Sequence, residues 1–289
     1  GEHPGEEVAP EDIPRSFSHK PVGWRLAIVA AGPLSNVLFA LAAYFLLLLV
    51  WGLPSLTTEV GDVVAGQPAA LAGVAKGDRV LAIAGQPVEH WGDMVGLIQA
   101  AQGQPVKVVL ERDRRQLTVT LTPQPVEVKN IFGEPTTVYR VGIVSSGQSV
   151  VLEVGPAQAA SLALARTYAA GELIVLSVVK MFERKVSVDS LGGPIMIAQV
   201  AGEAARQGLA PLLDLAAMLS VNLAILNLLP IPALDGGHLF FFTWEALTRR
   251  PVRLAVREKA QQVGMALLLL LMVLIFYNDI ARIVTGTPQ

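Results

Sequence analysis

The sequence contains no cysteine among its 289 residues. This absence excludes disulfide bonds, thiolate zinc sites and cysteine nucleophiles, so any metal must be held by His, Asp, Glu or Asn. Charge is also scarce, since 16% of the residues are charged and the net charge is -2. A chain with this charge offers no broad basic surface for phosphate, and we therefore exclude nucleic acid as a partner.

Long apolar runs take the place of the missing charges, and 52% of the residues are hydrophobic. Residues 26–53 contain no charged side chain and exceed the length of about 20 residues that crosses a bilayer. Segments 211–234 and 260–284 contain similar uncharged runs. We predict three transmembrane helices in a multi-pass α-helical membrane protein.

The distribution of basic residues predicts the orientation in the membrane. Residues 235–259 carry four arginines and one lysine against two glutamates, so this loop is expected to face the cytoplasm. The polar leader, residues 1–25, is then cytoplasmic, and the region between the first two spans lies outside the cytoplasm of an inner (plasma) membrane. Within a connector at 124–210, residues 157–183 are expected to form an amphipathic membrane-associated helix, with a fourth span left open.

A small β-rich domain is predicted at 59–123, where short runs alternate apolar and polar residues between turns. The run A-A-L-A-G-V-A-K-G-D-R-V-L-A-I-A-G at 69–85 predicts a helix ended by Gly73, a turn at Gly77 and Asp78, and a strand closed by Gly85. It resembles the PDZ signature. The resemblance implies an inserted PDZ-like domain that binds an extended peptide or C-terminus near Gly73, Gly77 and Asp78. Whether 124–155 belongs to a second, degenerate PDZ fold stays open.

Polar residues gather at the end of the second predicted span, in S-V-N-L-A-I-L-N-L-L-P-I-P-A-L-D-G-G-H at 220–238. Asn222, Asn227 and Asp235 are costly to bury in an apolar span, which marks a site. The two prolines break the helix, and the freed backbone is tolerated only in a cavity or inside protein. Asp235 could act as a hard-oxygen zinc ligand, or simply as a helix cap at the interface.

The pattern N-x-x-P-x-P-x-L-D-G-G-H resembles the C-terminal motif of the site-2 protease family, M50-type intramembrane zinc metalloproteases, and is most similar to the RseP branch. The resemblance implies that Asp235 is the third protein ligand of a catalytic zinc and that Asn222 and Asn227 position substrate or support the site. A-G-P-L-S-N at 31–36 resembles the family's G-P-x-x-N motif and adds Asn36. L-G-G-P-I at 191–195 resembles its S-G-P-I element, with Gly192 in place of serine.

The sequence departs from the family at the other half of the zinc site. H-E-x-x-H provides two zinc ligands and the general base, but this chain has only His3, His19, His90 and His238, none in that spacing. We interpret all four as structural or solvent-facing. Because the chain also begins at Gly1, we expect a fragment that lacks an N-terminal helix with H-E-x-x-H, and therefore no catalytic residue here beyond the zinc ligand Asp235.

These patterns predict an intramembrane zinc endopeptidase that cleaves single-pass membrane proteins in regulated intramembrane proteolysis, with the PDZ-like domain selecting substrates. The chain alone would be inactive. The alternative is a non-catalytic, membrane-tethered PDZ module or a pseudoprotease, and an upstream H-E-x-x-H in the reading frame would decide between them. A soluble PDZ serine protease is excluded because no G-x-S-x-G nucleophile motif is present.

Overall fold

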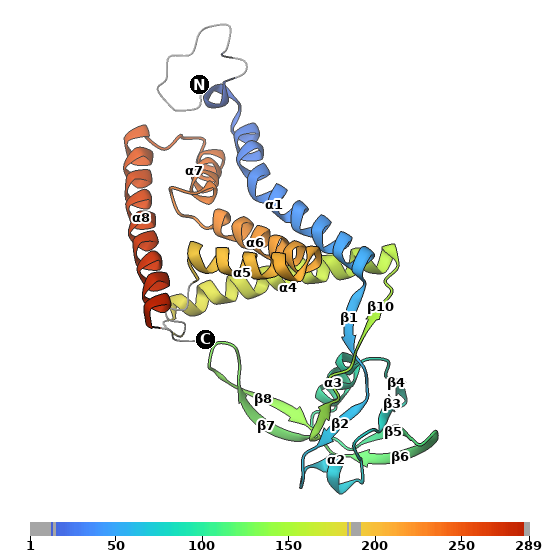
Figure 1. Ribbon diagram of the computed structural model, residues 1–289. Coiled ribbons are helices and arrows are strands. Elements are labelled where there is room, and N and C mark those ends of the chain that lie inside the picture. Colours follow the sequence, from blue (N-terminus) through green and yellow to red (C-terminus); the bar gives the residue numbers. More distant parts are fainter. Residues whose placement is uncertain (1–12, 14–15, 184, 186–191, 286–289) are drawn as a thin grey trace. The chain divides into compact units, whose positions relative to one another are not determined.

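The computed structural model describes residues 13, 16–183, 185 and 192–285, and the chain divides into two compact units (Figure 1). The first unit consists of Gly1–Val50 and Gly155–Gln289 and is helical. The second unit, Trp51–Val154, contains all the described strands. His3, Arg15 and Leu191 lie outside the described residues.

Long apolar helices dominate the helical unit. Its elements are a 3-10 turn at Phe17–His19, α1 (Val22–Trp51), α4 (Pro156–Phe182), α5 (Pro194–Gln207), α6 (Leu209–Leu228), α7 (Asp235–Thr248) and α8 (Leu254–Thr285). Among the described residues, four helices are long and apolar enough to cross a membrane: α1, α4, α6 and α8. The chain is therefore a multi-pass membrane protein, and α4 is a fourth candidate beside the three spans that the sequence predicted.

Small side chains lie at buried positions of both α1 and α6, and one hydrogen bond joins the two helices. The buried positions of α1 include Ala40 and Ala43, and those of α6 include Ala217 and Ala224. Ser220 of α6 donates a hydrogen bond to the backbone oxygen of Asn36 at 3.0 Å. Small residues and cross-helix hydrogen bonds are the usual means of helix association in a bilayer, where the hydrophobic effect gives no drive.

The predicted basic loop at 235–259 is wrong as a loop, because its first half is helix α7. The hydropathy pattern ended the second span at 234, whereas α6 ends at Leu228 and an irregular segment follows. Leu229 is extended, and short turns from Ile231 to Leu229 and from Leu234 to Ile231 lead into α7. The two prolines of this segment explain the break, since neither can donate a helical hydrogen bond.

The second unit contains ten strands and two helices. The strands are β1 (Leu53–Leu56), β2 (Val60–Val63), β3 (Arg79–Ile83), β4 (Gln86–Pro87), β5 (Val106–Arg112), β6 (Arg115–Leu121), β7 (Gln124–Lys129), β8 (Pro135–Arg140), β9 (Ile143–Ser145) and β10 (Ser149–Leu152), and the helices are α2 (Pro68–Leu71) and α3 (Trp91–Ala100). One sheet has the order β4-β3-β5-β6, and β1-β10, β2-β9 and β7-β8 form separate pairs.

The β-rich character predicted for 59–123 is found in the structure, where β5 and β6 form a hairpin with Val106 opposite Leu121 and Leu110 opposite Leu117. Alternate residues of β5 enter the core, as its pattern requires. The predicted domain end at 123 differs from the structure, however. β2 pairs with β9, β1 pairs with β10, and Val141 lies in the same core, so residues 124–154 complete this unit and are not a connector.

Candidate active site

The first turn of α7 packs tightly against the broken end of α6, and Asp235 is its first residue. A Cβ on Gly236 would collide with the backbone oxygens of Leu228 and Leu229, and a Cβ on Gly237 would collide with the backbone of Ile231 and Pro232. Both glycines are buried. Glycine is thus required at both positions after Asp235, because any side chain there would collide with the neighbouring backbone.

The carboxylate of Asp235 faces α1. Its Oδ2 lies 3.2 Å from the position that a Cβ on Gly32 would occupy, so the missing side chain of Gly32 leaves room for it. Pro33 follows inside the helix, and the Ser35 hydroxyl donates to the Gly32 oxygen at 2.7 Å. The structure therefore brings together the two motifs at 31–36 and 227–238, which are far apart in sequence.

Helix α8 closes the site from a third direction. Gly264 lies against the backbone of Ala233. A Cβ added to Gly264 would lie 3.0 Å from the backbone nitrogen of Ala233. His238, one turn after Asp235, lies 3.2 Å from the Gln261 side chain through its Nε2. Burial, followed by the nearby charge of Arg257, lowers the pKa of His238, so this ring is neutral at pH 7. It serves to join α7 to α8.

The three asparagines are half-buried, but they do not share one face. Asn227 is seven residues after Ser220, which places it on the face of α6 that meets α1. On α1, the backbone oxygen of Asn36 makes this contact by accepting the hydrogen bond of Ser220. Asn222 is two residues after Ser220, about 200° around the helix, and so lies on another face.

Asp235 has the character of a ligand without a partner. It is half-buried, and within the described part of the chain its carboxylate forms no hydrogen bond or ion pair. Hard oxygen is a suitable zinc donor, but a zinc site takes at least three protein ligands. The described residues contain no group of three His, Asp, Glu or Cys side chains that could hold a metal. Asp235 therefore fits zinc as one ligand of an incomplete set.

Besides His238, two histidines lie among the described residues. His19 forms a 3.1 Å contact with Ser16 in the segment before α1. His90 precedes α3 in the second unit, and His3 is outside the described residues.

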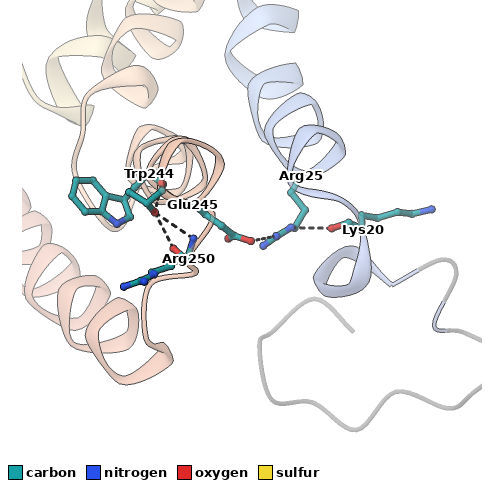
Figure 2. A network of polar contacts seen from close by, with 6 residues as sticks. Lys20, Arg25, Trp244, Glu245 and Arg250 are labelled. Carbon is teal, nitrogen blue, oxygen red and sulfur yellow. Dashed lines mark hydrogen bonds and ion pairs between the residues drawn. The ribbon is translucent and has the colours of Figure 1, made fainter.

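Sequence reasoning missed a cluster that fixes α7 against the start of α1. Arg25 donates to Glu245 at 2.6 Å, and both side chains are largely buried (Figure 2). Arg25 also lies 4.8 Å from the ring centre of Phe242, and Arg257 of α8 lies 5.1 Å from the same ring. No local pattern signals this cluster, because Arg25 lies more than 200 residues before its partner Glu245 in the sequence.

The residues named for peptide binding lie in the second unit. Gly73 and Gly77 have positive φ and end α2 and the following turn, as predicted. Gly77 lines a cavity of about 390 Å³ together with Glu59, Lys76 and Ser145. The side chain of Asp78 is fully buried, and it accepts hydrogen bonds from Arg112 and from the Ala75 N–H. Its carboxylate is thus occupied within the domain.

The sequence model of the family described as Peptidase family M50 matches residues 5–271. A relative from Rhizobium meliloti, whose name describes it as a zinc metalloprotease, is 36% identical over 95% of this chain and 74% of its own length. The zinc metalloprotease RasP of Geobacillus kaustophilus is 34% identical over 96% of this chain and 63% of its own length. The regulator of sigma-W protease RasP of Bacillus subtilis is 33% identical over 96% and 64%, respectively.

Proposed function

Because the chain belongs to peptidase family M50, the family of site-2 proteases, we propose that it provides the aspartate side of the zinc site of an intramembrane metalloendopeptidase. The relatives' names specify zinc metalloproteases. The observation that supports this role most directly is the seat of Asp235: a half-buried carboxylate without a partner, placed between α1 and the broken end of α6.

Asp235 would hold the metal, and Asn36 and Asn227 would offer amide groups to a substrate strand from the facing surfaces of α1 and α6. Bound zinc lowers the pKa of a water and polarises the scissile carbonyl. The sequence contains no H-E-x-x-H, so we propose that the other ligands and the general base lie outside these 289 residues. Proline at 230 and 232 keeps the backbone beside Asp235 free of helix, which suits an extended substrate.

The arrangement of the helix ends supports three crossings. The contacts of Arg25 with Glu245 and Phe242, and of Arg257 with Phe242, hold the starts of α1 and α8 near each other, and we propose that both starts lie at one membrane surface. Both helices are long enough to cross, so their other ends lie at the opposite surface. Asp279, near the end of α8, accepts hydrogen bonds from Gly193 and the following turn, so α5 begins at that opposite surface too.

Helix α4 also begins there, because β10, which precedes it, pairs with β1, which follows α1. If α4 crossed the membrane, residues 183–193 would have to cross back, and they are far fewer than the about 20 residues that a span needs. We therefore place α4 along the membrane surface, with α1, α6 and α8 as the spans. The arginines at 249–257 then face the cytoplasm, and the second unit lies outside it.

We interpret the second unit as PDZ-like and as a selector of substrates. β9 has β2 on one edge, and within the described residues no strand covers its other edge. An extended peptide from a single-pass membrane protein could add there as a further strand, near the Gly77 cavity.

The test uses the full-length gene product in detergent or vesicles, with a model single-span substrate. Zinc content and cleavage are measured for the parent, for Asp235→Ala, and for Glu258→Ala as a control that removes an exposed carboxylate of the same region. We expect bound zinc and cleavage in the parent and the control, with both lost in Asp235→Ala.

Zinc retained by Asp235→Ala at the parent level would remove this residue from the site. A full-length protein without zinc and without cleavage would contradict the peptidase proposal and leave the non-catalytic, membrane-tethered binding module or pseudoprotease.

A further inference from the structure

One face of α7 is apolar and uncovered. Phe240, Trp244 and Leu247 follow one another at spacings of four and three residues, so they form a stripe along the helix. Their exposed fractions are 57%, 52% and 80%. The other face carries Phe242, which is only 1% exposed, and Glu245, which binds Arg25. The stripe is thus not part of the packing that seats Asp235.

Positive charge gathers where this stripe ends. Arg249, Arg250 and Arg253 are all exposed, and none of them forms an ion pair with another described residue. Arg257 and Lys259 continue the basic run into α8. Within the described part of the chain these three guanidinium groups have no acidic partner, so they are available to an anion.

The turn that holds these arginines is fixed by one side chain. The Thr248 hydroxyl donates to the Trp244 oxygen at 2.8 Å and meets the backbone of Arg250 at 3.3 and 3.4 Å (Figure 2). Arg249 takes the left-handed conformation that ends α7. In Figure 2, Trp244 and Arg250 point to the side away from the Arg25–Glu245 pair. Stripe and arginines are thereby held together as one surface.

We propose that this α7 surface, made of Phe240, Trp244, Leu247, Arg249, Arg250 and Arg253, docks onto anionic phospholipid headgroups of the membrane in which the chain lies. An apolar stripe with aromatic residues beside a basic cluster is the combination that holds a helix in the interface of an anionic bilayer. Because α6 ends just before α7 and α8 begins just after it, the surface cannot move far from the bilayer. Asp235, the proposed zinc ligand, is the first residue of α7, so the lipid contact fixes the opposite end of the same helix.

The experiment follows the fluorescence of Trp244 as the single tryptophan of the full chain, after Trp24→Phe, Trp51→Phe and Trp91→Phe. The protein is reconstituted in vesicles of equal parts phosphatidylcholine and phosphatidylglycerol, with brominated acyl chains on one lipid or on the other. We expect stronger quenching by brominated phosphatidylglycerol. Each arginine near an anionic surface strengthens binding to that surface by about fivefold. The triple variant Arg249→Gln, Arg250→Gln, Arg253→Gln should therefore lose the preference for brominated phosphatidylglycerol.

A matched triple variant, Arg115→Gln, Arg140→Gln, Arg206→Gln, removes the same charge at exposed positions elsewhere and should keep the preference. Equal quenching by the two brominated lipids in the parent would overturn the proposal. It would mean that α7 contacts lipid without a preference for anionic headgroups. Absence of quenching by either would overturn it as well, because protein or water would then cover the stripe. These readings are independent of zinc and cleavage, so they stand apart from the peptidase test.

Discussion

At the scale of single residues, the position of Asp235 depends on a neighbour that has no side chain. We expect Gly236→Ala to reduce the free energy of unfolding by about 1–3 kcal/mol, because the added methyl must displace the backbone at Leu228 and Leu229. Chemical unfolding in micelles measures this loss. Gly202→Ala is the matched control: nothing lies within 4 Å of its Cβ in α5, and alanine there should stabilise by about 0.5–1 kcal/mol. Equal effects of the two substitutions would contradict this account of the glycine pair.

Asp78 gives a prediction with a pH dependence. Burial alone would raise the pKa of this carboxyl, but the hydrogen bonds from Arg112 and the Ala75 N–H outweigh burial and place the pKa below its usual value. A lowered pKa stabilises the fold above the pKa of the unfolded chain, and the contribution is lost as the pH falls through the folded value, below about pH 4. Asp78→Asn should cost about 2 kcal/mol at pH 7 and flatten this acid loss.

Hydrogen exchange of the amides of β3 and β5, measured in the full chain between pH 3 and pH 7, reports this stability. Asp113→Asn is the control, since Asp113 is exposed in a turn at φ 49°, a conformation that asparagine accepts. If the Asp78→Asn variant kept the acid sensitivity of the parent, another carboxyl would be responsible.

At the scale of elements, the absence of cysteine allows a direct test of α4. Gln158→Cys lies in its first turn and Lys185→Cys lies just past its end, and both positions are exposed. If α4 lies along the surface, a membrane-impermeant maleimide should label both variants from the same side of sealed vesicles. Labelling from opposite sides would show that α4 crosses the membrane.

The start of α5 is held by a residue of another helix. Asp279 is only 3% exposed and accepts hydrogen bonds from the N–H groups of Gly193, Ile195 and Met196 at 3.0–3.2 Å. Asp279→Ala leaves these groups without a cap, and we expect a cost of about 1–2 kcal/mol. Hydrogen exchange should show the protection of these amides falling, whereas Glu203→Gln, an exposed change on α5, should leave it unchanged. Unchanged protection in Asp279→Ala would show that the cap is dispensable.

Local patterns in the sequence predicted most elements but not their partners. The hairpin of β5 and β6 was predictable because its strands are adjacent and alternate in polarity. β9 and β10 were not, because their partners β2 and β1 lie some 80 to 100 residues earlier. Helix α7 was missed because the irregular segment between α6 and α7 is short and apolar, so the hydropathy pattern continues through it to residue 234. Asp235 was identified from its motif, whereas its contact with Gly32 required the fold.

At the scale of the whole molecule, the chain consists of two units with separate cores. The core of the second unit lies between Val60 and Ile143 and consists of residues from that unit alone. The helical unit is organised around the meeting of α1, α6, α7 and α8 near Asp235. This division separates the element that would select a substrate from the element that would hold the metal, so each can be altered without the other.

The division predicts two independent unfolding events. Asp78→Asn should lower the stability of the second unit and leave the helical unit unchanged, and Gly236→Ala should do the reverse. In the double variant the two losses should add to within about 0.5 kcal/mol, because sites without shared partners are energetically independent. Hydrogen exchange resolved by segment measures both losses in one experiment. A larger coupling would mean that the two units unfold as one, and selection of a substrate would then be energetically linked to the metal site.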